Sequence, residues 1–149
     1  MLESHNIFNN KKILIYGLGK SGLSASKFLK RNNKVIEYDD KKNKNYGKIR
    51  KIEFDYIILS PGIDINKCKL SNFLKKNYNK IHTDLDIFYN NYKYNYKITI
   101  TGTNGKSTTA KILYEVIKAQ KIDVRLVGNI GNPILLEKNI PNKPIFIIE

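Results

Sequence analysis

The stretch TITGTNGKSTT, residues 99–109, places two glycines, a lysine and several hydroxyl side chains directly after strand-forming residues. A glycine-rich loop between a strand and a helix is typical of phosphate binding, because glycines let backbone N–H groups approach a phosphate closely. The usual pattern, G-x-x-x-x-G-K-[ST], would place its first glycine at position 100, which is Ile100 here. The stretch therefore predicts either a nucleotide loop of a shorter type or a turn that happens to hold a lysine.

The residues around this loop alternate between strand-like and helix-like periodicity. Short apolar runs rich in β-branched residues predict strands, and longer runs with helical spacing of apolar residues predict helices. Strands that alternate with helices imply parallel sheets covered on both faces, so the sequence predicts an α/β fold. The predicted strands cover 12–16, 34–40, 55–59, 79–83, 97–101, 124–127 and 144–149, and the predicted helices cover 22–31, 66–77 and 107–120.

A polar, tyrosine-rich stretch at 89–96 has no clear periodicity and is interpreted as a connection between two domains. We predict a first domain over residues 1–90 and a second over 91–149. The second domain is expected to be incomplete, because a doubly wound sheet needs more strands than this part of the sequence supplies.

The helix predicted over 107–120 carries an apolar stripe formed by Ile112, Leu113, Val116 and Ile117.

The composition is that of a folded protein with a basic surface. Hydrophobic residues make up 41% of the chain, the formal net charge is +14, and Cys68 is the single cysteine. Lysines are scattered along the whole chain and only three residues are arginine, so we interpret the charge as solvated surface and expect no nucleic-acid partner. The apolar runs are too short to cross a bilayer, and one cysteine allows no internal disulfide. These features favour a cytoplasmic protein without a membrane partner, and we expect a monomer.

A first glycine loop, GLGKSG at residues 17–22, follows the predicted strand over 12–16 and opens a helix. It matches the G-x-G-x-x-G pattern, in which the N-terminus of a helix offers free N–H groups to a diphosphate. Asp39 lies 22 residues beyond Gly17, where such folds place an acid that binds a ribose. The loop predicts a nucleotide site without distinguishing NAD from another nucleoside diphosphate. A tight turn without a ligand is the structural alternative.

The second glycine loop has the composition of a triphosphate site. Its backbone N–H groups can surround a phosphate, Lys106 can neutralise the β- and γ-phosphate oxygens, and the Ser107 hydroxyl can bind Mg²⁺. A helix start capped by a serine or threonine would explain a hydroxyl here but not the whole Gly-Lys-Ser triplet. The predicted phosphate-binding residues are Gly102, Thr103, Asn104, Gly105, Lys106, Ser107 and Thr108.

Taken in order, these motifs resemble those of the Mur ligases, whose ATP loop has the shorter G-x-x-G-K-[ST] spacing. That spacing accounts for the absence of a glycine at position 100. Within the family the chain looks most like the enzymes that add D-glutamate to UDP-N-acetylmuramoyl-L-alanine, and the muramate–L-alanine ligases are the nearest alternative. The resemblance is carried by YGLGKSGLS (16–24), SPGI (60–63), DLDIF (84–88), ITGTNGKST (100–108), GNIG (128–131) and the terminal IIE (147–149).

The resemblance implies that residues 1–90 form a Rossmann-like domain for the UDP substrate and not for NAD. It places the diphosphate at the first glycine loop, the uridine at the residues after 34–38 and at the turn after 55–59, and the sugar-phosphate side near the GNIG turn. Lys41 stands where relatives commonly have an arginine, and a lysine cannot offer the planar fork of an arginine. The implied substrate-binding residues are Gly19, Lys20, Ser21, Asp39, Asp40, Lys41, Ser60, Pro61, Gly62 and Asn129.

For residues 91–149 the resemblance implies the front part of a P-loop-type α/β ATPase domain that uses ATP and Mg²⁺. Lys106 would carry the catalytic charge neutralisation, while Ser107 and Glu149 would bind Mg²⁺. In the implied reaction the lactyl-alanine carboxylate becomes an acyl phosphate, and the amine of D-glutamate then displaces phosphate.

The family also has a histidine and a carbamylated lysine further along its central domain, and a C-terminal domain that binds the amino acid. His5 and His82 precede the ATP loop, so we interpret both as surface or packing residues. We therefore expect that this chain alone cannot complete the ligase cycle. A UDP-sugar-binding fragment without turnover, and a nucleic-acid-binding protein driven by its charge, are the alternatives from other functional classes.

Overall fold

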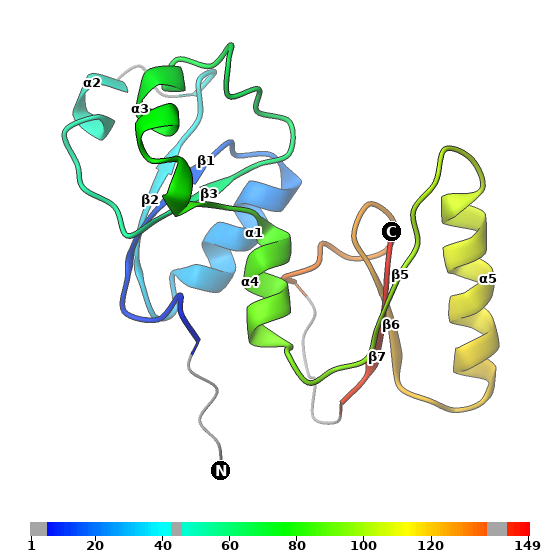
Figure 1. The fold of residues 1–149 in the computed structure, drawn as a ribbon. Coiled ribbons are helices and arrows are strands. Elements are labelled where there is room, and N and C mark those ends of the chain that lie inside the picture. Colours follow the sequence, from blue (N-terminus) through cyan, green and yellow to red (C-terminus); the bar gives the residue numbers. More distant parts are fainter. Residues whose placement is uncertain (1–5, 43–45, 137–142) are drawn as a thin grey trace. The chain divides into compact units, whose positions relative to one another are not determined.

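The computed structural model describes residues 6–42, 46–136 and 143–149, so His5 lies outside the described residues. The chain divides into two compact units, Met1–Asn91 and Tyr92–Glu149. Each unit is built on its own sheet (Figure 1), and the strands in both sheets pair in parallel. The predicted α/β fold with parallel sheets is therefore confirmed.

The first unit has a four-stranded sheet in the order β2-β1-β3-β4. The chain runs from β1 to β2 on one side and then to β3 on the other, so the direction of winding reverses between β1 and β3. Parallel α/β sheets bind ligands outside the carboxyl ends of the strands at such a reversal. The strands are β1 Lys12–Tyr16, β2 Lys34–Tyr38, β3 Tyr56–Leu59 and β4 Ile81–His82, and the helices are α1 Lys20–Leu29, α2 Tyr46–Ile49, α3 Ser71–Lys76 and α4 Asp84–Asn91, with a 3₁₀ turn at Tyr78–Lys80.

Helices lie on both faces of this sheet. On one face, α1 contacts β1, β2 and β3, and α4 lies beside α1 (Figure 1). The other face is covered by α2, α3 and the residues before them. Because β1 and β3 are inner strands buried on both faces, they read as continuous apolar runs. The cluster on the second face contains Leu14, Tyr16, Tyr38, Ile49, Phe54, Ile57, Leu59, Leu70 and Leu74.

The second unit has a three-stranded sheet in the order β5-β7-β6. Its strands are β5 Lys97–Thr99, β6 Val124–Val127 and β7 Ile145–Ile148, and α5 Lys106–Ala119 packs against β6 and β7. The last strand in sequence is thus the central one in space. Glu149 consequently follows the central strand at the edge where the loops after β5 and β6 also emerge.

The helix predicted over 66–77 begins only at Ser71. The residues before it form turns around Asp64, whose carboxylate accepts the Asn66 N–H at 2.9 Å and whose carbonyl accepts the Cys68 N–H at 3.1 Å. An aspartate that bonds to the N–H two residues on favours a turn over a helix. The prediction of the early part of this helix was therefore wrong.

The connection predicted over 89–96 overlaps α4, whose last three residues are 89–91. The start of α4 is capped reciprocally: the Thr83 N–H donates to the Asp86 carboxylate at 2.7 Å, and the Asp86 N–H donates to Thr83 Oγ1 at 3.4 Å. Such a capping box is a strong helix start, and Ile87 and Phe88 bury the inner face of the helix. The polar appearance of this stretch hid the helix, and the irregular connection begins at Tyr92.

Half of the apolar stripe on α5 is exposed. Leu113 and Ile117 pack on the core of the unit, whereas Ile112 and Val116 are 60% and 56% exposed. Ile112 and Val116 border a largely apolar hollow of about 730 Å³ whose lining also includes Leu126 of β6. In the described part of the chain β6 is the last strand on its side, so the sheet is too narrow to cover the whole stripe.

Candidate functional site

The first glycine loop lies at the carboxyl end of β1, next to the turn after β3. The Ser60 N–H donates to the Tyr16 carbonyl at 2.9 Å, and the Ser60 hydroxyl donates to the Gly17 carbonyl at 2.7 Å. Gly17 has a φ of +94°, and a Cβ on Gly22 would lie 1.8 Å from the Gly17 carbonyl oxygen. The close approach of α1 to β1 therefore requires the first and last glycines of the loop, whether or not a ligand binds.

Gly19 has no such structural requirement. Its φ is −77°, and a Cβ built there would meet no atom within 4 Å. It directly precedes α1, whose first N–H groups have no intrahelical partner, and Lys20 and Ser21 are the first two residues of that helix. The open space at Gly19 is suited to an anion that approaches the backbone of the helix start.

Asp39 follows β2 and connects its turn to the glycine loop. One carboxylate oxygen accepts the Leu18 N–H at 2.8 Å, and the other accepts the Lys41 N–H at 2.9 Å. The Leu18 N–H is the main cause that lowers the pKa of Asp39, because it stabilises the charged carboxylate. The structure thus gives Asp39 a role in shaping the loop, and its contact with a nucleotide stays a prediction.

Replacing Asp39 with asparagine is expected to destabilise the chain by about 1–3 kcal/mol at neutral pH, because one N–H donor would then face an amide NH₂ group. Since the pKa of Asp39 is lowered in the folded state, its contribution is complete above the unfolded value of 3.8 and is lost as the pH falls through the lower folded value. The difference in free energy of unfolding between the chain and the variant, measured in urea, should therefore shrink below pH 3.8. Glu53→Gln, on a side chain 92% exposed, is the control for lost charge. Equal destabilisation by both changes would contradict the role assigned to Asp39.

Hydrogen bonds from two other residues of the first unit hold the Asp40 carboxylate in place. Its Oδ1 accepts the Tyr16 hydroxyl at 2.9 Å, and its Oδ2 accepts the Lys69 N–H at 3.1 Å. Tyr16 is fully buried, and this burial is the main cause that raises its pKa, so its hydroxyl stays protonated and can donate. Burial likewise raises the pKa of the neighbouring Tyr38 to about 12. Tyr16 and Lys69, which sequence reasoning missed, thus engage both carboxylate oxygens of a predicted uridine contact.

The remaining residues predicted at the uridine lie on two turns. Lys41 is exposed on the turn after β2, and Pro61 and Gly62 are exposed on the turn after β3. The Ile63 N–H closes the second turn by donating to the Ser60 carbonyl at 3.0 Å. Both turns emerge from the carboxyl edge of the same sheet, as the prediction of a shared site requires.

The second glycine loop joins β5 to α5. Gly105 is the N-cap of α5 with a φ of +75°, and Gly102 has a φ of +148°, so both glycines adopt conformations that other residues avoid. Among the described residues no side-chain hydrogen bond caps the helix start, and Ser107 lies inside the first turn. The capping alternative for Ser107 is therefore not what the structure shows. The Lys106 ammonium folds back over the loop and donates to the Thr103 carbonyl at 3.4 Å.

Ser107 and Glu149, the two predicted Mg²⁺ ligands, meet although they are 42 residues apart: Ser107 Oγ donates to Glu149 Oε1 at 3.0 Å. The second carboxylate oxygen, Oε2, is buried and has no hydrogen-bond partner among the described residues. Burying a carboxylate oxygen without a hydrogen-bond partner raises the free energy of the folded state. A bound cation next to this oxygen would lower that free energy. Hydroxyl and carboxylate oxygens are ligands that Mg²⁺ accepts, so this pair fits the ion.

The described residues hold no cluster of three histidine, cysteine or acidic side chains that would surround a metal. A metal at Ser107 and Glu149 would therefore take its other ligands from water or from a bound phosphate. Mg²⁺ commonly binds in that way, with one or two carboxylates and the phosphates of its substrate.

The GNIG turn after β6 positions the end of β7. The Asn129 N–H donates to the Glu149 carbonyl at 2.8 Å, and the Glu149 N–H donates to the Val127 carbonyl at 3.2 Å. Gly128 has a φ of +114°, and a Cβ there would lie 2.4 Å from the Glu149 carbonyl oxygen. The glycine thus lets the turn approach the backbone of Glu149 and helps to place its carboxylate beside Ser107. Asn129 itself is exposed, as a predicted substrate contact needs to be.

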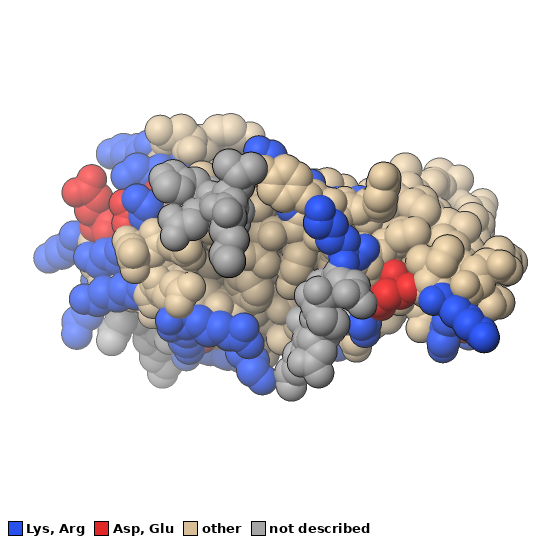
Figure 2. Space-filling model, turned by 90° about the horizontal axis from the view of Figure 1, so that it is seen from below, with Lys and Arg blue, Asp and Glu red and all other residues tan. Residues whose placement is uncertain are grey.

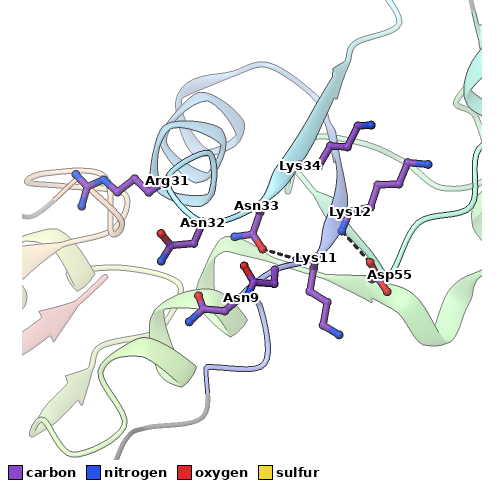
Figure 3. Close-up of a pocket in the computed structure, with 9 residues that line it drawn as sticks. Asn9, Lys11, Lys12, Arg31, Asn32, Asn33, Lys34 and Asp55 are labelled. Atoms are coloured by element: carbon purple, nitrogen blue, oxygen red, sulfur yellow. Dashed lines mark hydrogen bonds between the residues drawn. The ribbon is translucent and has the colours of Figure 1, made fainter.

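A polar hollow of about 710 Å³ lies at the opposite edge of the first sheet, where β1, β2 and β3 begin (Figure 3). Backbone N–H groups hold two of its side chains in place: the Lys11 N–H donates to Asn33 at 2.9 Å, and the Lys12 N–H donates to Asp55 at 2.8 Å. Its lining contains no residue of the glycine loops. The predicted nucleotide site therefore lies away from this hollow, because the carboxyl ends of parallel strands share the other edge.

Figure 2 shows lysine and arginine side chains in several separate groups on the visible face. This distribution supports the interpretation of the charge as solvated surface. Within the described ranges, none of the helices has both the length and the apolar character needed to span a bilayer.

Comparison with known proteins gives a consistent set of relatives, although no family model matches the chain. The chain is 33% identical over 147 residues to the UDP-N-acetylmuramoylalanine–D-glutamate ligase of Rickettsia bellii, with 89% of this chain and 32% of that protein covered. It is 34% identical over 159 residues to the ligase of the same name from Rickettsia felis, covering 97% of this chain and 34% of that protein. For the one from Aquifex aeolicus the identity is 38% over 123 residues, covering 82% and 29%.

These relatives confirm the resemblance predicted from the motifs. The chain spans about a third of the length of the ligases it matches.

Proposed function

We propose that this chain, a homologue of part of the D-glutamate-adding Mur ligases, supplies the UDP-substrate unit and the phosphate-binding part of the ATP unit of such a ligase. In this proposal the first unit is Rossmann-like and the second is the front of a P-loop-type ATPase domain. The enzyme would add D-glutamate to UDP-N-acetylmuramoyl-L-alanine with the energy of ATP in the synthesis of peptidoglycan precursors. The observation that carries the proposal is the hydrogen bond between Ser107 and Glu149 beside a glycine-rich loop.

The second unit offers groups suited to hold and neutralise a triphosphate. The positive φ values of Gly102 and Gly105 shape a loop whose N–H groups can surround a phosphate, and Lys106 can turn from the Thr103 carbonyl toward it. Ser107, in the first turn of α5, and Glu149, directly after β7, would both bind the Mg²⁺ ion. When bound, Mg·ATP would supply the phosphoryl group that activates the substrate carboxylate.

The first unit offers a binding surface for the UDP part of the substrate. The open space at Gly19 and the start of α1 suit the diphosphate, while the turns after β2 and β3 would lie at the uridine. In this proposal Asp40 and Tyr16 hold the turn after β2 in place, and Asp39 both shapes the loop and faces the nucleotide. No residue of the chain is assigned to D-glutamate, so that contact is assigned to the part of the ligases that the chain does not match.

Replacing Ser107 with alanine tests the Mg²⁺ site. The affinity of the 149-residue chain for ATP in the presence of Mg²⁺ should fall about 10-fold, because the ion loses a ligand beside a carboxylate. Isothermal titration with Mg²⁺, and again with EDTA, separates the metal-dependent part of the affinity. Without Mg²⁺ the two proteins should bind ATP alike.

Thr109→Ala is the matched control, since it removes a hydroxyl from an exposed residue of the same helix that lies outside the predicted phosphate-binding residues. Its effect on the Mg²⁺-dependent affinity should stay below about 2-fold, a difference of less than 0.5 kcal/mol. Equal losses in both variants, or a Ser107→Ala effect that persists in EDTA, would contradict the metal role of Ser107.

A further inference from the structure

The turn after β2 folds back over the first glycine loop. The Lys41 N–H donates to the Asp39 carboxylate at 2.9 Å, and the Lys42 N–H donates to the Asp39 carbonyl at 3.2 Å, which closes the turn. The chain thereby reverses within four residues, and the ammonium group of Lys42 donates to the Leu18 carbonyl at 3.4 Å. Of two adjacent exposed lysines, it is Lys42 whose side chain contacts the glycine loop.

The charge of Lys42 is available for a ligand. Within the described ranges Lys42 forms no ion pair with a carboxylate, and its partner on the loop is a neutral carbonyl. Its charge also helps to lower the pKa of Asp39, to which Lys41 contributes its backbone N–H. The ammonium group of Lys42 therefore lies near the loop, where it interacts with the Asp39 carboxylate through its charge but forms no direct ion pair among the described residues.

Leu18, the residue that Lys42 contacts, directly precedes the open position Gly19. Both backbone groups of Leu18 are bound by the turn after β2, because its N–H donates to Asp39 at 2.8 Å. The loop and the turn therefore form one connected structure, and a ligand that enters at Gly19 meets the start of α1 and Lys42 together. An ammonium group is a compact charge without the planar fork of an arginine, so it suits a diphosphate better than the edge of a uracil ring.

We propose that Lys42, and not Lys41, is the cation that determines the affinity of this loop for the diphosphate of its nucleotide. The inference rests on the proposed function, in which the first unit binds a UDP-linked substrate. The prediction for Lys41 is a contact with the uridine, so the inference gives the diphosphate a cation that the sequence analysis did not name. Lys41, an exposed residue of the same turn, would contribute little.

The two lysines provide a matched test in the full 149-residue chain. Lys42→Met keeps the length of the side chain and removes its charge, and Lys41→Met makes the same change one residue away. By isothermal titration at low salt, Lys42→Met should weaken UDP binding about 10-fold or more, and Lys41→Met less than about 2-fold. Lys42→Arg, which restores the charge, should recover most of the affinity. The affinity for uridine, followed by NMR titration, should be the same in all four proteins.

Each outcome decides the inference. A larger loss of UDP affinity in Lys41→Met, or equal losses in the two methionine variants, overturns it while leaving the proposed function in place. A parallel loss of uridine and UDP affinity in Lys42→Met also overturns it, because the lysine would then shape the turn and not bind the diphosphate. Absence of UDP binding by the unsubstituted chain overturns the proposed function of the first unit and the inference with it. Melting temperatures without ligand check that the variants are folded.

Discussion

Replacing Lys106 with alanine is expected to lower ATP-dependent ligation about 10²- to 10³-fold in a ligase that contains residues 1–149. The proposed reaction builds up negative charge on the transferred phosphoryl group, and the protein accelerates it mainly by placing positive charge there in advance. Lys106 begins α5, and its ammonium group rests on the Thr103 carbonyl, within the same loop. Alanine leaves this loop with its N–H groups but without its cation. Phosphate release under saturating substrates measures the effect.

The control for this prediction is Lys111→Ala, on an exposed lysine of the same helix. It changes the net charge of α5 equally, and it should leave the rate within about 2-fold, since Lys111 lies outside the phosphate-binding loop and its exposed charge is weakened by salt. Binding of UDP should be unchanged in both variants, because the proposal places it on the other unit. A rate that survives Lys106→Ala, or falls equally in Lys111→Ala, would refute the assignment of the ATP loop.

Replacing Gly19 with valine is expected to remove the stabilisation of the chain by UDP while leaving the fold intact. The side chain would enter open space, since a Cβ there meets no atom within 4 Å, and the poorer helix cap costs about 1 kcal/mol or less. A diphosphate would however collide with the valine as it approaches the start of α1. At a hundred-fold excess of ligand over Kd the unsubstituted chain should gain about 2.7 kcal/mol, and the variant should gain none. Thermal unfolding with and without UDP gives both values.

Gly22→Val provides the contrast. Its Cβ would lie 1.8 Å from the Gly17 carbonyl oxygen, so α1 could not keep its place against β1. We expect this variant to lose about 3 kcal/mol or more without any ligand. NAD should not stabilise the unsubstituted chain. Stabilisation by NAD and not by UDP, or a Gly19→Val variant that UDP still protects, would contradict the proposed UDP site.

Short-range patterns predicted most of the strands and both glycine loops. The predicted strands at 12–16 and 55–59 match β1 Lys12–Tyr16 and β3 Tyr56–Leu59, because a buried parallel strand needs a continuous apolar segment. The loops follow because a strand that turns sharply into a helix needs glycines at positive φ, as at Gly17 and Gly105. These requirements act on the backbone over a few residues, so they can be predicted directly from the residue types.

Predictions were wrong where a polar side chain formed hydrogen bonds with backbone N–H groups a few residues away and so fixed the local structure. The reciprocal cap between Thr83 and Asp86 starts α4, whose last three residues lie in the stretch predicted as a connection, and the turns around Asp64 delay α3. On α5, helical periodicity identified the apolar stripe correctly. How much of it is buried depends instead on the width of the sheet beneath, and Ile112 and Val116 remain exposed.

By itself, the sequence determined the alternation of strands and helices, the two loops, and the family to which its motifs point. Only the tertiary structure decided which residues meet. It brings Ser107 to Glu149 across 42 residues, engages Asp40 with Tyr16 and Lys69, and turns Lys42 rather than Lys41 toward the glycine loop. The physical reason is that backbone geometry is set by neighbouring residues. Contacts between side chains depend instead on strand order and on the path of each turn, and β7 becomes the neighbour of β5 only when the sheet forms.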